Sequence, residues 1–378
     1  MLAREKAVHL QLHIGPQDGS LNPAPYRLLR LFQSCDVTQD ASQGAGAQGF
    51  QLSFALQRDD EADYSLLRDE LLAPLRRVAI VLCLPSSEVT LMDGVITHYQ
   101  LSPQAQSLGQ ATLAISGRDL GALMDLEQRD LPFPNESDSE IVKKVLSGYA
   151  KIGLSPDVKT TGHGRSRHDR TLNQYETDLR HVQRLAQNNG FVFTLEPQQP
   201  GRVRAYFGPP QQSDEEQRAL TVGLGPGSNV RSLSFSFDPL VPVNTVSHAP
   251  DHDNNRSRKS VHDQPPPEPV SANPAPALRT IRLRQVGRRS AADADNAAQA
   301  LRQTVPDAVT GNGEVDGALY GDCIRAGRKI IVRGAGDTYD GLYWVRRVSH
   351  RFSAGSYTQQ ISIGREGTGA RPGLRAEG

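Results

Sequence analysis

The sequence predicts a mainly β protein with an α+β insertion, in which two β-barrel domains are joined by a small α/β domain. Three observations support this fold class. The chain of 378 residues holds 34 glycines and 25 prolines, a composition typical of many turns between short elements. Segments that alternate apolar and polar residues occur near both ends, and two segments with helical periodicity lie between them. The predicted domains are residues 1–130, 131–229 and 230–366, followed by a flexible tail at 367–378.

The first predicted domain consists mostly of strands. Alternation of apolar and polar residues is clear in several segments, and Gly, Asn, Pro and Asp gather between them. One short helix is expected at residues 63–75. An antiparallel barrel or sandwich follows from this pattern. The predicted strands are residues 8–14, 50–56, 78–84, 89–101 and 111–117.

The middle segment has a different character. Residues 135–153 begin with Ser, Asp and Glu, continue with an apolar face at helical spacing, and close on a glycine, which predicts a capped helix. A second helix is expected from Thr177 to a glycine that ends it, and a strand follows at once. This strand is expected to pair with residues 202–208. The scaffold motif of this helix and strand comprises Leu179, Val182, Leu185, Gly190, Phe191 and Phe193.

The last predicted domain contains strands at 230–238 and 241–249, and then an insertion. Residues 250–276 are polar and rich in proline, with too few apolar residues to offset the loss of chain entropy, so this insertion is predicted to be disordered. Regular structure is expected to resume after it. The predicted elements are a strand at 279–286, a helix at 290–305, and strands at 329–334, 341–352 and 357–366.

The overall composition excludes several classes of protein. With 42 basic and 42 acidic residues the formal net charge is zero, so the whole molecule is not an electrostatic binder of nucleic acid or acidic membranes. Three distant cysteines signal neither a disulfide framework nor a zinc site, and reduced, partly buried thiols are expected. The N-terminus lacks the apolar stretch of a signal peptide, and the longest apolar run, residues 78–84, is too short to cross a bilayer. The sequence contains no nucleophile elbow and no zinc-protease helix.

Four stretches, in their order along the chain, resemble the hub protein of contractile phage tails. This family comprises the phage late control protein D proteins, and the N-terminal part of the VgrG proteins of type VI secretion is similar. The resembling stretches are residues 91–101 with 115–126, residues 133–150, residues 175–195 and residues 327–366.

The resemblance implies a structural role. In this family each chain carries two tail-tube-like β-barrels, so that a homotrimer presents six similar barrels and adapts the sixfold tail tube to a threefold spike. The implied partners are the tail tube or a tube-initiator protein, a separate spike protein and other baseplate proteins. No cofactor, metal, membrane contact or catalytic residue is implied, and DNA or cargo would only pass through the lumen. The chain would be made in the bacterial cytoplasm and assembled into a virion tail or an injection-particle baseplate. The second-barrel motif comprises Gly334, Gly336, Asp337, Gly341, Tyr343, Val345 and His350.

Two alternatives to a structural hub remain open from the residues. A cell-wall hydrolase at the tail tip would need paired carboxylates, and the candidates Glu136 with Asp138 and Glu176 with Asp178 lie at helix starts, where capping explains them. A glycan or nucleic-acid binding module could use the local basic residues between Arg256 and Arg289, although these also suit a solvated linker.

Overall fold

The computed structural model describes residues 8–41, 45–59, 63–85, 87–104, 109–161, 172–209, 213–251, 256–262, 269–283 and 307–371. The helix predicted at 290–305 lies outside the described residues. The helices are α1 (Tyr26–Leu29), α2 (Gly121–Met124), α3 (Asp138–Ser147), α4 (Asp178–Asn189) and α6 (Gly317–Tyr320), with 3-10 helices η1 (Ser65–Arg68), η2 (Glu70–Leu72), η3 (Ala150–Ile152) and η4 (Gly225–Gly227). The strands up to residue 208 are β1 (His9–Gly15), β2 (Asn22–Pro23), β3 (Phe32–Asp40), β4 (Gly49–Gln57), β5 (Arg77–Cys83), β6 (Glu88–Pro103), β7 (Gln110–Asp119), β8 (Leu131–Phe133), β9 (Leu154–Val158), β10 (Leu172–Gln174), β11 (Val192–Gln199) and β12 (Arg202–Gly208). The strands after it are β13 (Ser213–Thr221), β14 (Val230–Phe237), β15 (Val243–Asp251), β16 (Arg256–His262), β17 (Asn273–Pro274), β18 (Arg279–Leu283), β19 (Val309–Asp316), β20 (Arg328–Arg333), β21 (Gly341–Ser353), β22 (Ser356–Arg365) and β23 (Gly367–Thr368).

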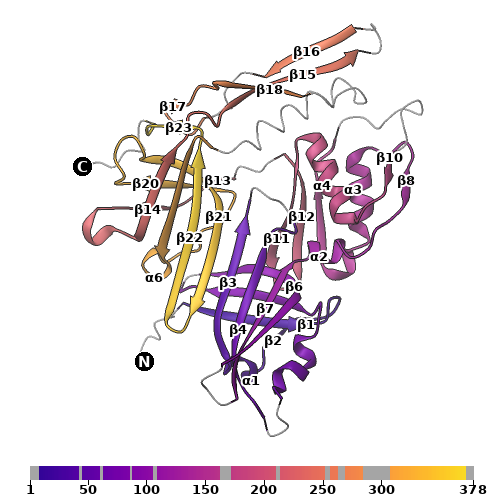
Figure 1. The fold of residues 1–378 in the computed structure, drawn as a ribbon, viewed down its shortest axis with the longest axis vertical. Helices are drawn as coiled ribbons and strands as arrows, with labels where there is room; N and C mark the ends of the chain where they lie inside the picture. The colour runs from indigo at the N-terminus through magenta and orange to yellow at the C-terminus, as the bar shows by residue number, and fades with distance from the viewer. Residues whose placement is uncertain are drawn as a thin grey trace.

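The predicted mainly β fold with an α+β insertion is confirmed, but the two β regions are not separate. One 13-stranded sheet runs through both of them in the order β14-β19-β22-β21-β3-β4-β7-β6-β5-β1-β2, with β20 on β21 and β13 on β20. The regions join where β21 lies antiparallel to β3 (Figure 1). Among the described ladders none pairs the first and last strand of either region, so each region is an open part of a shared sheet.

The two β regions have the same strand topology. The first β unit, β1 and β3 to β7, has the spatial order β3-β4-β7-β6-β5-β1, and the second β unit has the order β14-β19-β22-β21-β20-β13. If the strands of each unit are numbered along the chain, both orders read 2-3-6-5-4-1. The chain therefore contains one six-stranded arrangement twice.

The residue register of the two units also matches. In both, the second strand has a bulge after its first residue, and the fifth strand has a bulge near its middle. Rows of paired residues across four strands consequently correspond position by position, and we call residues at the same place in the two units equivalent. One such row is Ser34, Ser53, Ala114 and Gln100 in the first unit and Ser232, Glu314, Gln360 and Ser349 in the second.

A pair of left-handed residues supports this correspondence. Leu75 has a φ of 61°, which is unusual for a residue with a Cβ, and its amide donates to the carbonyl oxygen of Ile96 at 2.9 Å. Gly327, with a φ of 81°, donates in the same way to Val345 at 2.8 Å. Ile96 and Val345 each directly precede the bulge of their strand. The units differ in one strand direction, because β1 is antiparallel to β5 whereas β13 is parallel to β20.

The small α/β part packs two helices on a three-stranded sheet of β11, β12 and β9, as Figure 1 shows beside the first unit. Helix α3 begins with a capping box, in which the hydroxyl of Ser137 accepts from the amide of Glu140 and the Glu140 carboxylate accepts from the amide of Ser137. Helix α4 begins at the Thr177 cap and ends at left-handed Gly190. Both predicted helices and the β11–β12 hairpin are confirmed.

The helix predicted at 63–75 is wrong. Two 3-10 helices, η1 and η2, stand in its place. Asp69 between them has extended backbone, and its carboxylate accepts from the amide of Leu71, so this side chain begins a new turn instead of continuing the first.

The predictions of a disordered insertion at 250–276 and a flexible tail at 367–378 are wrong for the residues that form strands there. Strand β16 pairs antiparallel with β15, and β17 pairs with β23. Val270 is buried against Leu342 and Trp344 of β21, and the hydroxyl and amide of Ser271 both donate to the Glu366 carboxylate. One buried apolar residue and local hydrogen bonds thus fix residues 270–274, although the surrounding sequence is polar.

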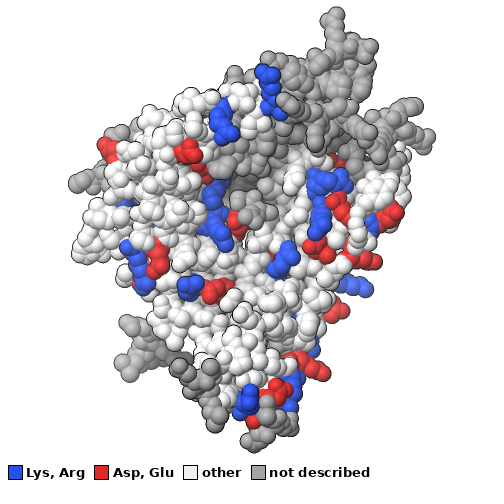
Figure 2. All heavy atoms as spheres, viewed as in Figure 1, with Lys and Arg blue, Asp and Glu red and all other residues white. Residues whose placement is uncertain are grey.

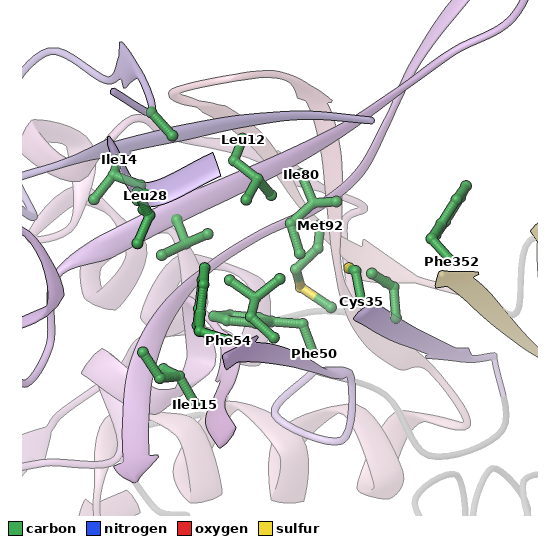
Figure 3. Close-up of a cluster of buried hydrophobic side chains, with 14 of the residues drawn as sticks. Leu12, Ile14, Leu28, Cys35, Phe50, Phe54, Ile80, Met92, Ile115 and Phe352 are labelled. Atoms are coloured by element: carbon green, nitrogen blue, oxygen red, sulfur yellow. The ribbon is translucent and has the colours of Figure 1, made fainter. Parts of the chain in front are cut away.

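The hydrophobic cores cross the predicted domain boundaries. The core of the first unit also contains Cys323, Phe352 and Tyr357, and Figure 3 shows Phe352 in the same cluster as Cys35 of β3. The core of the α/β part includes Val95 of β6 together with the residues of α2. The divisions near residues 130 and 230 therefore stay a prediction about sequence segments.

Candidate assembly site

The junction of β3 and β21 is the feature of the sheet that bears most directly on assembly, because it shows how two of these units meet. Residues Arg347 to Ser353 pair with Asp40 to Ser34 in antiparallel register. The hydroxyls of Thr38 and Ser349 lie 3.0 Å apart on one face, and Arg351 forms an ion pair of 2.7 Å with Asp36. Val348 and Val37 are fully buried on the other face. The junction is thus polar on its outer face and largely buried on its inner face.

A histidine is buried at the same junction. His350 pairs with Val37 across the ladder, and its Nδ1 lies 3.0 Å from the hydroxyl of Tyr357. Its Nε2 has no hydrogen-bond partner in the part of the chain that the structure describes. Burial, with a smaller contribution from the positive charge of Arg325, lowers the pKa of His350 to about 3. The imidazole is therefore neutral in the folded protein at neutral pH.

This histidine is expected to make the protein less stable in acid. In the unfolded chain it binds a proton below its ordinary pKa of 6.5, but in the folded chain only near pH 3, so the free energy of unfolding falls as the pH falls through that window. The loss amounts to roughly 2 kcal/mol between pH 7 and pH 5. Urea unfolding of the parent and of His350→Gln at both pH values, at one protein concentration, measures it.

The comparison isolates one group. Asp119, whose pKa burial raises to about 6, has the opposite sign, but it is present in both proteins and cancels. An equal loss of stability in the parent and in His350→Gln would contradict the assignment to His350.

In the described part of the chain, the strands equivalent to β3 and β21 each have an unpaired edge, at the other ends of the two units. Among the described residues, β14, the equivalent of β3, pairs only with β19. Residues 98–103 of β6, which we call its outer half, are the equivalent of the part of β21 that binds β3, and within the described ladders they pair only with β7. Phe237 is 43% exposed and Leu101 is 36% exposed, whereas the residue equivalent to Leu101, His350, is 0% exposed. The same positions are thus covered at the junction and open at the two ends.

A buried ion pair connects the first unit to the α/β part. Arg77 of β5 binds both carboxylate oxygens of Asp93 of β6, at 2.6 and 2.9 Å, and the two side chains are 2% and 0% exposed. Arg77 also donates to the carbonyl oxygen of Ile152 at 2.6 Å. Asp93 accepts from the amide of Gly201 at 2.8 Å. Each charge therefore holds one backbone segment of the α/β part against the sheet.

The scaffold motif contributes to the hydrophobic core of the α/β part. Leu179, Val182 and Leu185 of α4 are buried in its core, and Phe193 joins them from β11. Phe191 packs at the edge of that core, with its ring 5.4 Å from the ring of Phe207. The carbonyl oxygen of Phe193 also accepts from the amide of Ala45, which ties the motif to the first unit. A role in holding the units together remains a prediction for these residues.

The second-barrel motif divides between a turn and a core. Tyr343, Val345 and His350 are fully buried on β21. The four other residues, Gly334, Gly336, Asp337 and Gly341, lie in the β20–β21 turn or at the start of β21, and all three glycines have positive φ.

The aspartate whose side chain holds this turn is not the one in the predicted motif. Asp337 is exposed, whereas buried Asp340 accepts from the amides of Gly334 and Ala335. Asp340 lies in the segment Thr338-Tyr339-Asp340-Gly341, whose composition is typical of a turn.

The carboxylates considered for hydrolysis are occupied by structural contacts. Glu136 pairs with Lys144 at 2.9 Å, and Asp138 accepts from the side-chain amide of Asn189. Glu176 pairs with Arg184 at 2.6 Å, and buried Asp178 accepts from the hydroxyl of Tyr149. Each contact explains its carboxylate without a substrate.

A pocket between the first unit and α4 is lined by one carboxylate, that of Asp125. This group accepts from the Thr177 hydroxyl at 2.6 Å. Among the described residues that line this pocket there is therefore no pair of carboxylates for glycoside hydrolysis.

On the one face that Figure 2 views, the described charged residues do not gather by sign. Figure 2 shows lysines and arginines interspersed with aspartates and glutamates on the face that it views. The three cysteines are free, as predicted, and they are buried more fully than the partial burial expected; burial raises the pKa of the Cys323 thiol to about 12. No helix in the described part of the chain has the length and apolar character to span a membrane.

The fold is that of known tail proteins. The tail protein from Neisseria meningitidis MC58 superposes with a TM-score of 0.64 at 16% identity, covering 97% of each chain. The 43 kDa tail protein of prophage MuSo2 from Shewanella oneidensis gives a TM-score of 0.63 at 14% identity, covering 95% of this chain and 99% of its own. The E. coli c3393 protein, a component of the type VI secretion system with structural similarity to T4 bacteriophage tail proteins gp27 and gp5, gives 0.53 at 15% identity, covering 91% of this chain and 76% of its own. At these identities the likeness shows the fold alone.

The sequence identifies the family. The phage tail baseplate hub (GPD) family matches residues 50–356, which is most of the chain, and the protein therefore belongs to this family. Among curated protein sequences none is significantly similar. The resemblance to a contractile-tail hub is confirmed.

Proposed function

We propose that three copies of this chain form the ring of a baseplate hub, which adapts a sixfold tail tube to a threefold spike. The observation that supports this proposal is the doubled six-stranded unit with matching register. Two equivalent units in each of three chains offer six similar docking surfaces, while the trimer itself keeps threefold symmetry. A chain with a single unit could not meet both symmetries.

The proposed partners follow from this position between tube and spike. One face of the ring would bind the tail tube or its initiator, and the other a separate spike protein, with further baseplate proteins around the ring. DNA or cargo would pass through the lumen. The protein would be synthesised in the bacterial cytoplasm, assemble into the tail or injection particle, and act by binding without a reaction of its own.

The mass of the protein in solution tests this proposal. Mass photometry across a concentration series is expected to show a species three times the 41.2 kDa chain mass. A peptidoglycan-release assay run on the same sample is expected to give no signal above buffer. A monomer at every concentration, or release of peptidoglycan fragments, would overturn the proposal.

A further inference from the structure

The second unit of one chain and the first unit of the next have complementary unpaired strands. Strand β14 is equivalent to β3, and the outer half of β6 is equivalent to the half of β21 that binds β3. The chain thus contains one complete example of this junction and the two separate halves of a second. These halves lie in different units, so one copy of the chain can supply the half that another copy lacks.

We infer that β14 of one subunit pairs antiparallel with the outer half of β6 in a second copy of this chain, in the register of the β3–β21 junction. The number of copies in the ring rests on the proposed function, whereas the strand pairing between two copies does not. Equivalent positions specify the register. Within the chain Ser349 pairs with Thr38, and their equivalents are Gln100 and Ser236, which would pair across the new interface.

The exposure of the two edges fits this occupant. On the inner face of the β3–β21 junction, Val348 lies opposite Gln39 and His350 lies opposite Val37. At the inferred interface, the equivalent pairs are Tyr99 opposite Phe237 and Leu101 opposite Phe235. Phe237 and Leu101 are exposed in the single chain, and Tyr99 and Phe235 are half-buried. Pairing would cover all four as one apolar seam. Facing aromatic and aliphatic side chains stabilise such a strand pair.

The unpaired backbone groups of the two edge strands also favour this pairing. An unpaired strand edge presents a row of amide and carbonyl groups that readily recruit another strand. Since β14 carries one arginine, Arg231, and no proline, it has little to block such pairing. Because the two edges differ, the contact is heterologous, and contacts of that kind close into a ring when the rotation between subunits allows it.

Cysteine pairs test the register directly in the full-length protein. Thr38 and Ser349 have hydroxyls 3.0 Å apart, so the equivalent pair Gln100→Cys and Ser236→Cys is expected to be within disulfide reach between subunits. Mild oxidation of the double variant should give covalent dimers and trimers on a non-reducing gel. A mixture of the two single variants should give dimers only. Either single variant alone should stay monomeric on the gel, because a heterologous contact brings no residue next to its own copy.

Two control variants define what a negative result means. Thr38→Cys with Ser349→Cys should form a disulfide within one chain and prove that the oxidation works. Gln100→Cys with Phe235→Cys places the thiols on opposite faces of the strands and should not cross-link.

Each result decides the matter. Covalent trimers from the matched pair support the inference. Trimers by mass without this cross-link, or cross-linking of a single variant, overturn the interface and leave the hub proposal standing. A protein that is monomeric at every concentration and does not cross-link overturns both.

Discussion

Replacing Asp93 with alanine is expected to lower the free energy of unfolding by about 3–5 kcal/mol, because it leaves the Arg77 guanidinium buried without its counter-ion. The substitution also removes the acceptor for the Gly201 amide, so the α/β part loses one of its links to the first unit. Urea unfolding followed by far-ultraviolet circular dichroism, at a fixed protein concentration, measures the change. Amide exchange is expected to quicken first around Gly201.

An ion pair whose arginine is exposed provides the control for Asp93→Ala. Arg27 pairs with Asp69 at 2.9 Å but is 68% exposed, so Arg27→Ala is expected to change the free energy of unfolding by less than about 1 kcal/mol. The double variant Arg77→Met with Asp93→Leu should lose less stability than Asp93→Ala, because no buried charge remains unpaired. Equal effects of Asp93→Ala and Arg27→Ala would contradict the role assigned to the buried pair.

Replacing Phe237 with lysine is expected to abolish the trimer while the single chain stays folded. Phe237 is 43% exposed on the unpaired edge of β14, so a charge there costs little in the monomer. Across the inferred interface it would face Tyr99 and leave a charge buried against an aromatic ring in place of the apolar seam. A rise of at least about a hundredfold in the dissociation constant of the trimer, equivalent to about 2.7 kcal/mol, is the expected magnitude.

Mass photometry and circular dichroism together measure this effect. The control is Leu126→Lys, because Leu126 is 61% exposed and lies outside both edge strands. That variant should form trimers as the parent does. A Phe237→Lys protein that still forms the parent trimer at low concentration would show that β14 lies outside the subunit interface.

The sequence predicted those elements whose local pattern agrees with their final surroundings. Strands β5, β6 and β21 combine apolar content or alternation with flanking turns, and α4 has both a cap and a closing glycine. Strand β19 was missed because its segment contains Gly311 and Gly313, which are typical of turns. In the structure a Cβ at Gly313 would lie 2.6 Å from the carbonyl oxygen of Ser232, so close packing requires the glycine in this central strand.

The duplication could not be seen in the sequence because the units share register and not residue types. Asp119 and Arg365 are equivalent and both fully buried, yet they carry opposite charges. Asp119 accepts from the amides of Gly46 and Gly121, whereas Arg365 donates to the carbonyl oxygens of Asp340 and Thr338. Each side chain thus binds polar groups of the neighbouring backbone, Asp119 as a hydrogen-bond acceptor and Arg365 as a donor.

The candidate assembly site escaped sequence analysis for a related reason. Strand β3, half of the junction, has the sequence FQSCDVTQD, whose polar residues match a loop as well as a strand. Its long-range partner, β21, lies some three hundred residues further along the chain, and no local signal encodes that contact.

Electron microscopy of the purified protein viewed along its symmetry axis tests the central claim most directly. If two equivalent β units in each chain let three subunits imitate six, end-on averages will show six similar densities around one lumen, in a particle with threefold symmetry. A two-fold particle, or a ring with three densities and gaps between them, would contradict the claim.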